Sequence, residues 1–249
     1  MQIKAVLPTS LIEYPGHIAT VLYVGACNFR CPYCYNVDLV LRPAQLPDIE
    51  VAEVLQGLEM RRGFVDGVVI TGGEPTIQAD LAAFLSQIRR LGLAVKLDTN
   101  GYRPDVLRTC LQQGLVDYVA MDIKSSLPKY GQAAGATVDK ELLLQSIQLL
   151  LHADIEYEFR TTVVPGLVDV EDVQAIVALI RGAKRYYLQY FLPAATVGWG
   201  EQVPVGSPSF DVMQQMAEIA SRVVEEVGIR GQPYPREMLR STVAQNRER

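Results

Sequence analysis

One stretch of the sequence, HIATVLYVGACNFRCPYCYN at residues 17–36, joins an apolar run to three closely spaced cysteines. The first nine residues are rich in β-branched and aromatic side chains, a composition that favours a strand. Cys27, Cys31 and Cys34 follow directly, so they stand where this strand ends. Functional residues of parallel α/β sheets gather at the carboxyl ends of strands. The stretch therefore predicts a parallel sheet with a site at the end of its first long strand.

Strand-like and helix-like segments alternate along the rest of the chain, as expected for βαβ units. No G-x-G-x-x-G run follows a strand, which argues against a dinucleotide-binding fold. We therefore expect an α/β fold, a partial (β/α)6 TIM-like barrel in a single domain over residues 1–249. Its core is expected at about 17–193, and a C-terminal loop, helix and tail at 194–249. The expected strands are 17–25, 67–71, 93–99, 116–124, 155–164 and 186–191, and the expected helices are 49–62, 79–90, 104–113, 140–152, 170–181 and 209–226.

Composition narrows the classes of function. The 249 residues are 49% hydrophobic, enough for one substantial core. The net charge is −5 and no basic cluster stands out, so we expect no nucleic-acid partner. The N-terminus does not resemble a signal peptide, and no apolar run is long enough to cross a bilayer. We expect a cytoplasmic protein with no membrane partner, in which four cysteines serve as metal ligands or core residues rather than disulfides.

Three thiols within eight residues can converge on one metal centre, and thiolates suit zinc or iron–sulfur clusters. A structural zinc site usually has four protein ligands. Cys110 lies on an expected helix beside Leu111, where a buried apolar role is the simpler interpretation. The two histidines are not spaced as partners for the triplet. A centre with three protein ligands and one open position is the prediction, with zinc as the alternative.

The spacing C-x3-C-x2-C, with Tyr33 before the last cysteine, resembles the radical S-adenosylmethionine superfamily. The resemblance implies that Cys27, Cys31 and Cys34 hold a [4Fe–4S] cluster whose fourth iron binds the amino and carboxylate groups of S-adenosylmethionine. It also implies reductive cleavage to a 5′-deoxyadenosyl radical, the activity of an oxidoreductase. Tyr33 would lie along the adenine, although core packing explains this residue equally well.

A glycine pair follows the second expected strand, in Thr71-Gly72-Gly73-Glu74-Pro75. Two glycines allow a backbone to approach a ligand closely, and Glu74 could accept hydrogen bonds from an ammonium group. By itself the run also fits an ordinary tight turn. It matches the GGEP motif of the same superfamily, which implies that Gly72, Gly73 and Glu74 contact the methionine amino group.

Polar residues also end the next strands, in Asp98-Thr99-Asn100-Gly101 and Asp122-Ile123-Lys124. These residues could form an oxygen-rich, anionic pocket, or could be ordinary caps and a surface ion pair. The runs resemble the branch that activates glycyl-radical enzymes. There they help to hold S-adenosylmethionine, with a monovalent cation near the aspartates. Arg160 matches an arginine of that branch that approaches the methionine portion, whereas alone it fits an exposed strand edge.

Two further features match the activating branch. Residues 10–16, SLIEYPG, resemble its opening S-x-x-D/E-x-P-G segment, and Cys34-Tyr35-Asn36 resembles its C-H-N ending with Tyr35 replacing histidine. The resemblance implies an activating enzyme for anaerobic ribonucleotide reductase. It also implies a flavodoxin or ferredoxin that reduces this activating enzyme. Related activases often carry a polar or basic residue just beyond the position of Leu192-Pro193. This sequence has AAT there, at residues 194–196. The alternatives are an activase of a different glycyl-radical enzyme, a small-molecule enzyme similar to 7-carboxy-7-deazaguanine synthase, and a zinc-bound scaffold.

Overall fold

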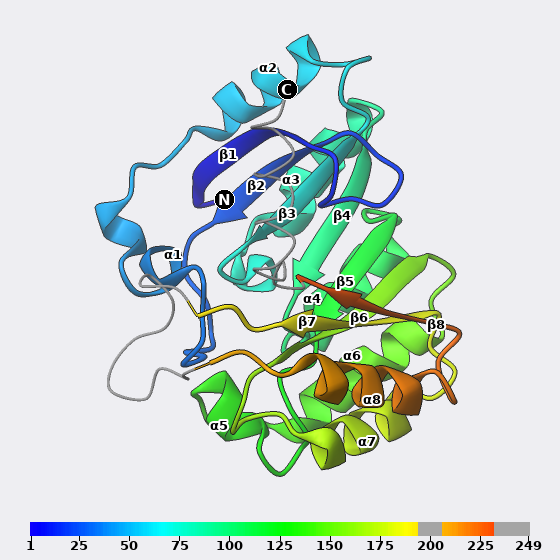
Figure 1. Ribbon diagram of the computed structural model, residues 1–249. Coiled ribbons are helices and arrows are strands. Elements are labelled where there is room, and N and C mark those ends of the chain that lie inside the picture. The colour runs from blue at the N-terminus through cyan, green and yellow to red at the C-terminus, as the bar shows by residue number, and fades with distance from the viewer. Residues whose placement is uncertain (194–205, 232–249) are drawn as a thin grey trace, which may run out of the picture.

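The computed structural model describes residues 1–193 and 206–231, whose strands form one eight-stranded sheet that curves without closing (Figure 1). Strand order in the sheet follows chain order from β1 to β8. Strands β2 to β8 run parallel, and β1 pairs antiparallel with β2. Helices pack on the outer face, so the inner, concave face remains for a site. This arrangement confirms the α/β fold and the open, barrel-like form expected from the sequence.

The strands are β1 (Ile3–Ser10), β2 (Ala19–Val24), β3 (Gly67–Gly72), β4 (Ala94–Thr99), β5 (Tyr118–Asp122), β6 (Glu156–Val163), β7 (Arg185–Tyr190) and β8 (Glu226–Arg230). The α-helices are α1 (Val37–Leu41), α2 (Val51–Met60), α3 (Leu81–Arg90), α4 (Pro104–Gln112), α5 (Tyr130–Ala134), α6 (Lys140–Leu151), α7 (Val170–Leu179) and α8 (Phe210–Ala220). Two 3-10 turns, η1 (Pro43–Gln45) and η2 (Pro75–Ile77), complete the elements.

The six expected strands correspond to β2–β7, and the six expected helices to α2, α3, α4, α6, α7 and α8. The sequence prediction missed β1 and β8, which lie at the two edges of the sheet. It also missed the short helices α1 and α5. The expected loop over 192–207 and the irregular tail after Gly231 lie almost wholly outside the described residues.

The expected helix over 209–226 was wrong at its C-terminal end, because α8 stops at Ala220 and Glu226 begins β8. Backbone hydrogen bonds to a distant turn explain the difference. The N–H groups of Glu225 and Glu226 donate to the carbonyls of Ala183 and Lys184, at 3.0 Å each. These contacts align the chain beside β7, and tertiary pairing therefore overrides the helical pattern of the sequence.

The apolar core has two parts. The larger part lies between the sheet and the outer helices, and it includes Leu22, Leu97 and Phe159 at 0% exposure. The smaller part fills the concave side near the amino-terminal ends of the strands. Its members are Tyr14, Ala19, Val21, Val69, Tyr118 and Ala120. Because this cluster fills the interior of the barrel near the amino-terminal ends of the strands, open space is left at their carboxyl ends.

Helix length also bears on membrane association. Among residues 1–193 and 206–231, no helix combines the length and the apolar character that a bilayer span requires.

Candidate functional site

A cavity of about 500 Å³ lies on the concave face at the carboxyl ends of the strands. Its wall contains every residue that the sequence nominated for cofactor or metal binding. The cysteine loop after β2 forms one side, and the tips of β3 to β6 form the other. These thirteen residues are Cys27, Cys31, Tyr33, Cys34, Gly72, Gly73, Glu74, Asp98, Thr99, Asn100, Asp122, Lys124 and Arg160.

The three cysteines of the loop are free thiols. Two of their sulfur atoms accept backbone hydrogen bonds, from the N–H of Phe29 to Cys27 Sγ and from the N–H of Asn36 to Cys34 Sγ, both at 3.3 Å. The N–H of Cys34 donates to the carbonyl of Cys31 at 3.1 Å, which closes a tight turn. Such N–H groups stabilise a thiolate and are typical of iron–sulfur sites.

The glycine pair after β3 fixes this loop against the sheet. The N–H of Gly73 donates to the carbonyl of Val24, and the N–H of Glu74 to that of Ala26, both at 2.8 Å. A Cβ atom on Gly73 would lie 1.8 Å from the Ala26 oxygen, and Gly72 has a φ of +110°. The glycines therefore admit the protein's own backbone, one residue before Cys27. The sequence interpretation, in which they admit a ligand, missed this role.

A second glycine holds the other side of the loop. The N–H of Arg30 donates to the carbonyl of Ala134 at the end of α5, at 2.8 Å. Gly135 ends this helix at a φ of +60°, and a Cβ there would lie 2.0 Å from the Arg30 oxygen. Because α5 is only one short turn of helix, the sequence pattern gave no sign of this contact. Two backbone clamps thus define the position of the cysteine loop.

Burial raises the pKa of all three thiols of the cysteine loop. Burial raises the pKa of Cys27 to about 12 and that of Cys31 to about 11. The positive charge of Lys124 opposes the shift at Cys31. Iron bound at these cysteines would replace the thiol protons, because the ligand form of cysteine is the thiolate. Three free thiols at the mouth of one cavity, with N–H donors and a lysine nearby, fit an iron–sulfur cluster.

A mononuclear metal site fits less well. Within the part of the chain that the structure describes, no three Cys, His, Asp or Glu side chains converge in the way that a single ion requires. A [4Fe–4S] cluster has a different requirement, because each of its thiolates binds a separate iron atom. The ligand geometry therefore gives no support to the zinc alternative.

Glu74 lies beneath the cysteine loop with 1% of its surface exposed. Its Oε1 atom accepts hydrogen bonds from the N–H and hydroxyl of Thr76 and from the Thr99 hydroxyl, the last at 2.7 Å. Its Oε2 atom accepts one, from the N–H of Asn100 at 2.7 Å. Burial raises the pKa of Glu74, and these hydrogen bonds oppose the rise. A carboxylate oxygen has two lone pairs, so Oε2 can accept a further donor from the cavity.

The strand tips carry a chain of alternating charges. The Arg160 guanidinium contacts Asp122 through Nε at 2.8 Å and Asp98 through an NH1 contact at 3.3 Å. Lys96 pairs with Asp98, and Lys124 pairs with Asp122 at 3.0 Å. The anionic pocket expected from the sequence is therefore compensated by three cationic side chains. A monovalent cation near these aspartates stays a prediction from the resemblance. Arg160 is largely buried in this network, with 11% of its side chain exposed, and is not an exposed edge residue.

Acid should weaken the same network. Burial alone would raise the pKa of Asp122, but the charges of Arg160 and Lys124 outweigh it and lower the pKa to about 2. A carboxyl group with a lowered folded-state pKa stabilises the fold above its ordinary value near 4 and loses that contribution as pH falls toward 2. We expect Asp122→Asn to lower the free energy of unfolding at pH 7 and to flatten its decline between pH 4 and pH 2.

Urea unfolding at several pH values measures this effect. Asp154→Asn is the control, because Asp154 is exposed before β6 and makes no ion pair within the described residues. Equal pH slopes for Asp122→Asn and the unmodified protein would remove Asp122 from the acid-sensitive groups.

The aromatic residues of the loop have different environments. Tyr33 is 4% exposed and packs edge-on against Phe191, with ring centroids 6.3 Å apart. Its hydroxyl finds no hydrogen-bond partner among the described residues. Tyr35, at the position of the branch's histidine, accepts the Leu192 N–H at 2.8 Å. Tyr35 thus ties the cysteine loop to the segment after β7, while Tyr33 remains a cavity-wall residue beside Cys31.

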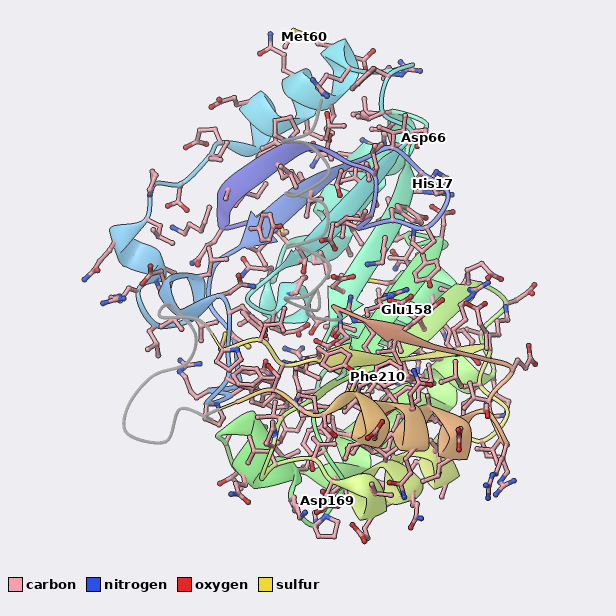
Figure 2. The ribbon with its side chains drawn as sticks, viewed as in Figure 1. His17, Met60, Asp66, Glu158, Asp169 and Phe210 are labelled. Carbon is pink, nitrogen blue, oxygen red and sulfur yellow. The ribbon has the colours of Figure 1, made fainter. Side chains whose placement is uncertain are left out.

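Sequence reasoning missed three cavity residues on the last three strands. Thr162, Gln189 and Arg230, from β6, β7 and β8, also line the cavity. Arg230 binds Glu158, a buried carboxylate that lies next to β8 in Figure 2. Alternate residues of β6 point inward, and this pattern could have indicated Glu158. No pattern in the sequence indicates Arg230 on β8. Cys110, as expected, is fully buried in the outer core.

The sequence is similar to those of several known proteins. The profile of the radical SAM superfamily matches residues 21–180. A provisionally named glycyl-radical enzyme activating enzyme of Methanocaldococcus jannaschii is 30% identical over 92% of this chain and 95% of its own length. The 7-carboxy-7-deazaguanine synthase of Thermococcus kodakarensis is 30% identical over 66% of this chain and 71% of its own.

Solved structures share the fold. Streptococcus suis SuiB bound to S-adenosylmethionine superposes with a TM-score of 0.65 at 14% identity, covering 87% of this chain and 54% of SuiB. At this identity the likeness concerns the fold.

Proposed function

Because the chain belongs to the radical S-adenosylmethionine superfamily, whose cofactors are a [4Fe–4S] cluster and S-adenosylmethionine, we propose that it activates a glycyl-radical enzyme. The cluster supplies the electron that cleaves S-adenosylmethionine, and the resulting 5′-deoxyadenosyl radical abstracts hydrogen from a glycine of the partner. The support is one observation: the cysteine loop and the polar tips of β3 to β6 line a single cavity. The relative from M. jannaschii, similar along nearly its whole length, favours an activase.

In this proposal, each part of the cavity wall has one task. Cys27, Cys31 and Cys34 bind the cluster. The free lone pair of Glu74 Oε2 accepts a hydrogen bond from the methionine ammonium, and Arg160 and Lys124 attract its carboxylate. Residues of the surrounding turns and strand tips make the remaining cofactor contacts. They are Tyr33, Gly72, Gly73, Asp98, Thr99, Asn100 and Asp122.

The partner that we propose is anaerobic ribonucleotide reductase, on the combined motifs SLIEYPG, CNFRCPYCYN, GGEPT, DTNG and MDIK. A flavodoxin or ferredoxin as electron donor and a cytoplasmic location stay predictions from the same resemblance.

Electron paramagnetic resonance tests the proposal directly. The protein is reconstituted anaerobically with iron and sulfide, reduced, and mixed with S-adenosylmethionine and the candidate reductase. We expect a glycyl doublet that is absent when S-adenosylmethionine is omitted, together with 5′-deoxyadenosine in the product mixture. Formation of 5′-deoxyadenosine with no doublet would reject the reductase as partner. Absence of both products would reject the radical chemistry for this chain.

A small-molecule substrate is the second candidate, supported by the similarity to a 7-carboxy-7-deazaguanine synthase. Thr162 and Gln189 add neutral polar groups to the cavity beyond those assigned to the cofactor. They could position a small polar molecule. Transfer of deuterium from a deuterated small-molecule substrate into 5′-deoxyadenosine, measured in the same assay, would favour this candidate over an activase.

A further inference from the structure

Arg230, on the edge strand β8, binds the buried carboxylate of Glu158. Arg230 donates two hydrogen bonds to Glu158, NH1 to Oε1 at 2.7 Å and NH2 to Oε2 at 2.9 Å. This bidentate arrangement fixes both partners more firmly than a single contact does. Glu158 is 0% exposed and also accepts the Tyr118 hydroxyl at 2.7 Å. The carboxylate is therefore a buried charge whose main partner comes from β8.

The placement of Arg230 is built into two neighbouring strands. Its guanidinium carbon lies 3.4 Å from the centroid of the Tyr187 ring, a stacked cation–π contact. The ring can lie across β8 because residue 228 is glycine, where a Cβ atom would stand 2.6 Å from Tyr187. Tyr187 is tied in turn to Glu226 through its hydroxyl. Arg230 is thus held over the concave face and not left free at the sheet edge.

Glu158 is within reach of a second arginine. Arg160 NH1 lies 3.9 Å from Glu158 Oε1 and 3.3 Å from Asp98 Oδ2. The Arg160 guanidinium therefore stands between the carboxylates of the cofactor cavity and the buried carboxylate below them. While Arg230 occupies both oxygens of Glu158, Arg160 remains paired with Asp98 and Asp122. Without Arg230, a buried and poorly paired carboxylate would attract Arg160, because unpaired buried charge is costly.

We propose that Arg230 is a positioning residue, which by neutralising Glu158 keeps Arg160 directed at the bound S-adenosylmethionine. The proposal rests on the proposed function, in which Arg160 contacts that cofactor. It assigns to β8 a role in cofactor affinity. The lowered pKa of Glu158, which burial alone would raise, agrees with a carboxylate kept charged by Arg230 and Arg160.

Equilibrium dialysis of S-adenosylmethionine against the anaerobically reconstituted protein tests the proposal without any partner enzyme. We expect Arg230→Gln to raise the dissociation constant about ten-fold, since a small displacement of a binding group costs much of its interaction. The dissociation constant of Arg230→Lys should fall between those of the unmodified protein and Arg230→Gln, because lysine keeps the charge and loses the paired contact. Arg185→Gln is the matched control, since Arg185 pairs with Glu156 and Glu226 outside the cavity.

A double variant separates positioning from direct contact. Glu158→Gln removes the charge that would attract Arg160, so Arg230→Gln with Glu158→Gln should recover most of the affinity lost in Arg230→Gln alone. Thermal unfolding of each variant shows whether the fold is retained. If Arg230→Gln unfolds, the Arg230→Lys and double variants decide the matter.

Two outcomes would overturn the proposal. Unchanged affinity in Arg230→Gln, beside normal binding by the unmodified protein, rejects the positioning role and leaves the proposed function standing. A double variant as weak as Arg230→Gln assigns Arg230 to direct contact instead. Failure of the unmodified protein to bind S-adenosylmethionine rejects the proposed function itself.

Discussion

Replacing any one of Cys27, Cys31 or Cys34 by alanine should abolish cluster incorporation and reduce S-adenosylmethionine cleavage to background. The cavity offers three thiols for three iron atoms, and no fourth cysteine lies near enough to substitute for a lost one. A cluster that has lost one of three ligands exposes two irons and is readily lost. Iron and sulfide analysis after anaerobic reconstitution, with the absorbance band at roughly 400 nm, measures the effect.

Cys110→Ala is the matched control, because it removes the same side chain from a different place. Cys110 is 0% exposed on α4 and packs in the outer core, on the far side of the sheet from the cavity. We expect full cluster loading and a loss of stability of about 1 kcal/mol from the missing buried sulfur. Retention of cluster and cleavage in one of the three loop variants, or loss of both in Cys110→Ala, would contradict the ligand assignment.

Gly73→Ala should prevent cluster assembly although it changes no ligand. The new Cβ atom would meet the Ala26 carbonyl oxygen at 1.8 Å, well below any real contact. The loop backbone cannot move aside freely, because the Gly73 and Glu74 N–H groups are bonded to Val24 and Ala26. Relief of the clash must displace the start of the cysteine loop and with it Cys27. We expect iron content after reconstitution to fall to a small fraction of that of the unmodified protein.

Gly57→Ala provides the comparison for this substitution. Gly57 lies within α2, and a Cβ atom there would meet nothing within 4 Å. Alanine at a helical position of this kind should stabilise the protein by roughly 0.5–1 kcal/mol and leave the iron content unchanged. Normal cluster loading in Gly73→Ala would show that the glycine pair does not fix the cysteine loop.

The sequence by itself predicted the six central strands, the six long helices and thirteen of the residues that line the cavity. The reason is that these features are local. Buried parallel strands appear as β-branched runs, and a parallel sheet brings the carboxyl ends of its strands to one side. Residues that follow such strands, such as Glu74 after β3 and Asp122 at the end of β5, therefore converge wherever the sheet forms.

The tertiary structure decided how those residues are held. The strand β8 forms because it pairs with β7, and that pairing brings Arg230 to Glu158. Arg160 on β6 pairs with both Asp98 on β4 and Asp122 on β5, so an apparently anionic pocket is a balanced network. Contacts between residues distant in the chain leave no local pattern. The sequence thus determined which groups meet at the cavity, and only the folded structure determined their charge partners and orientation.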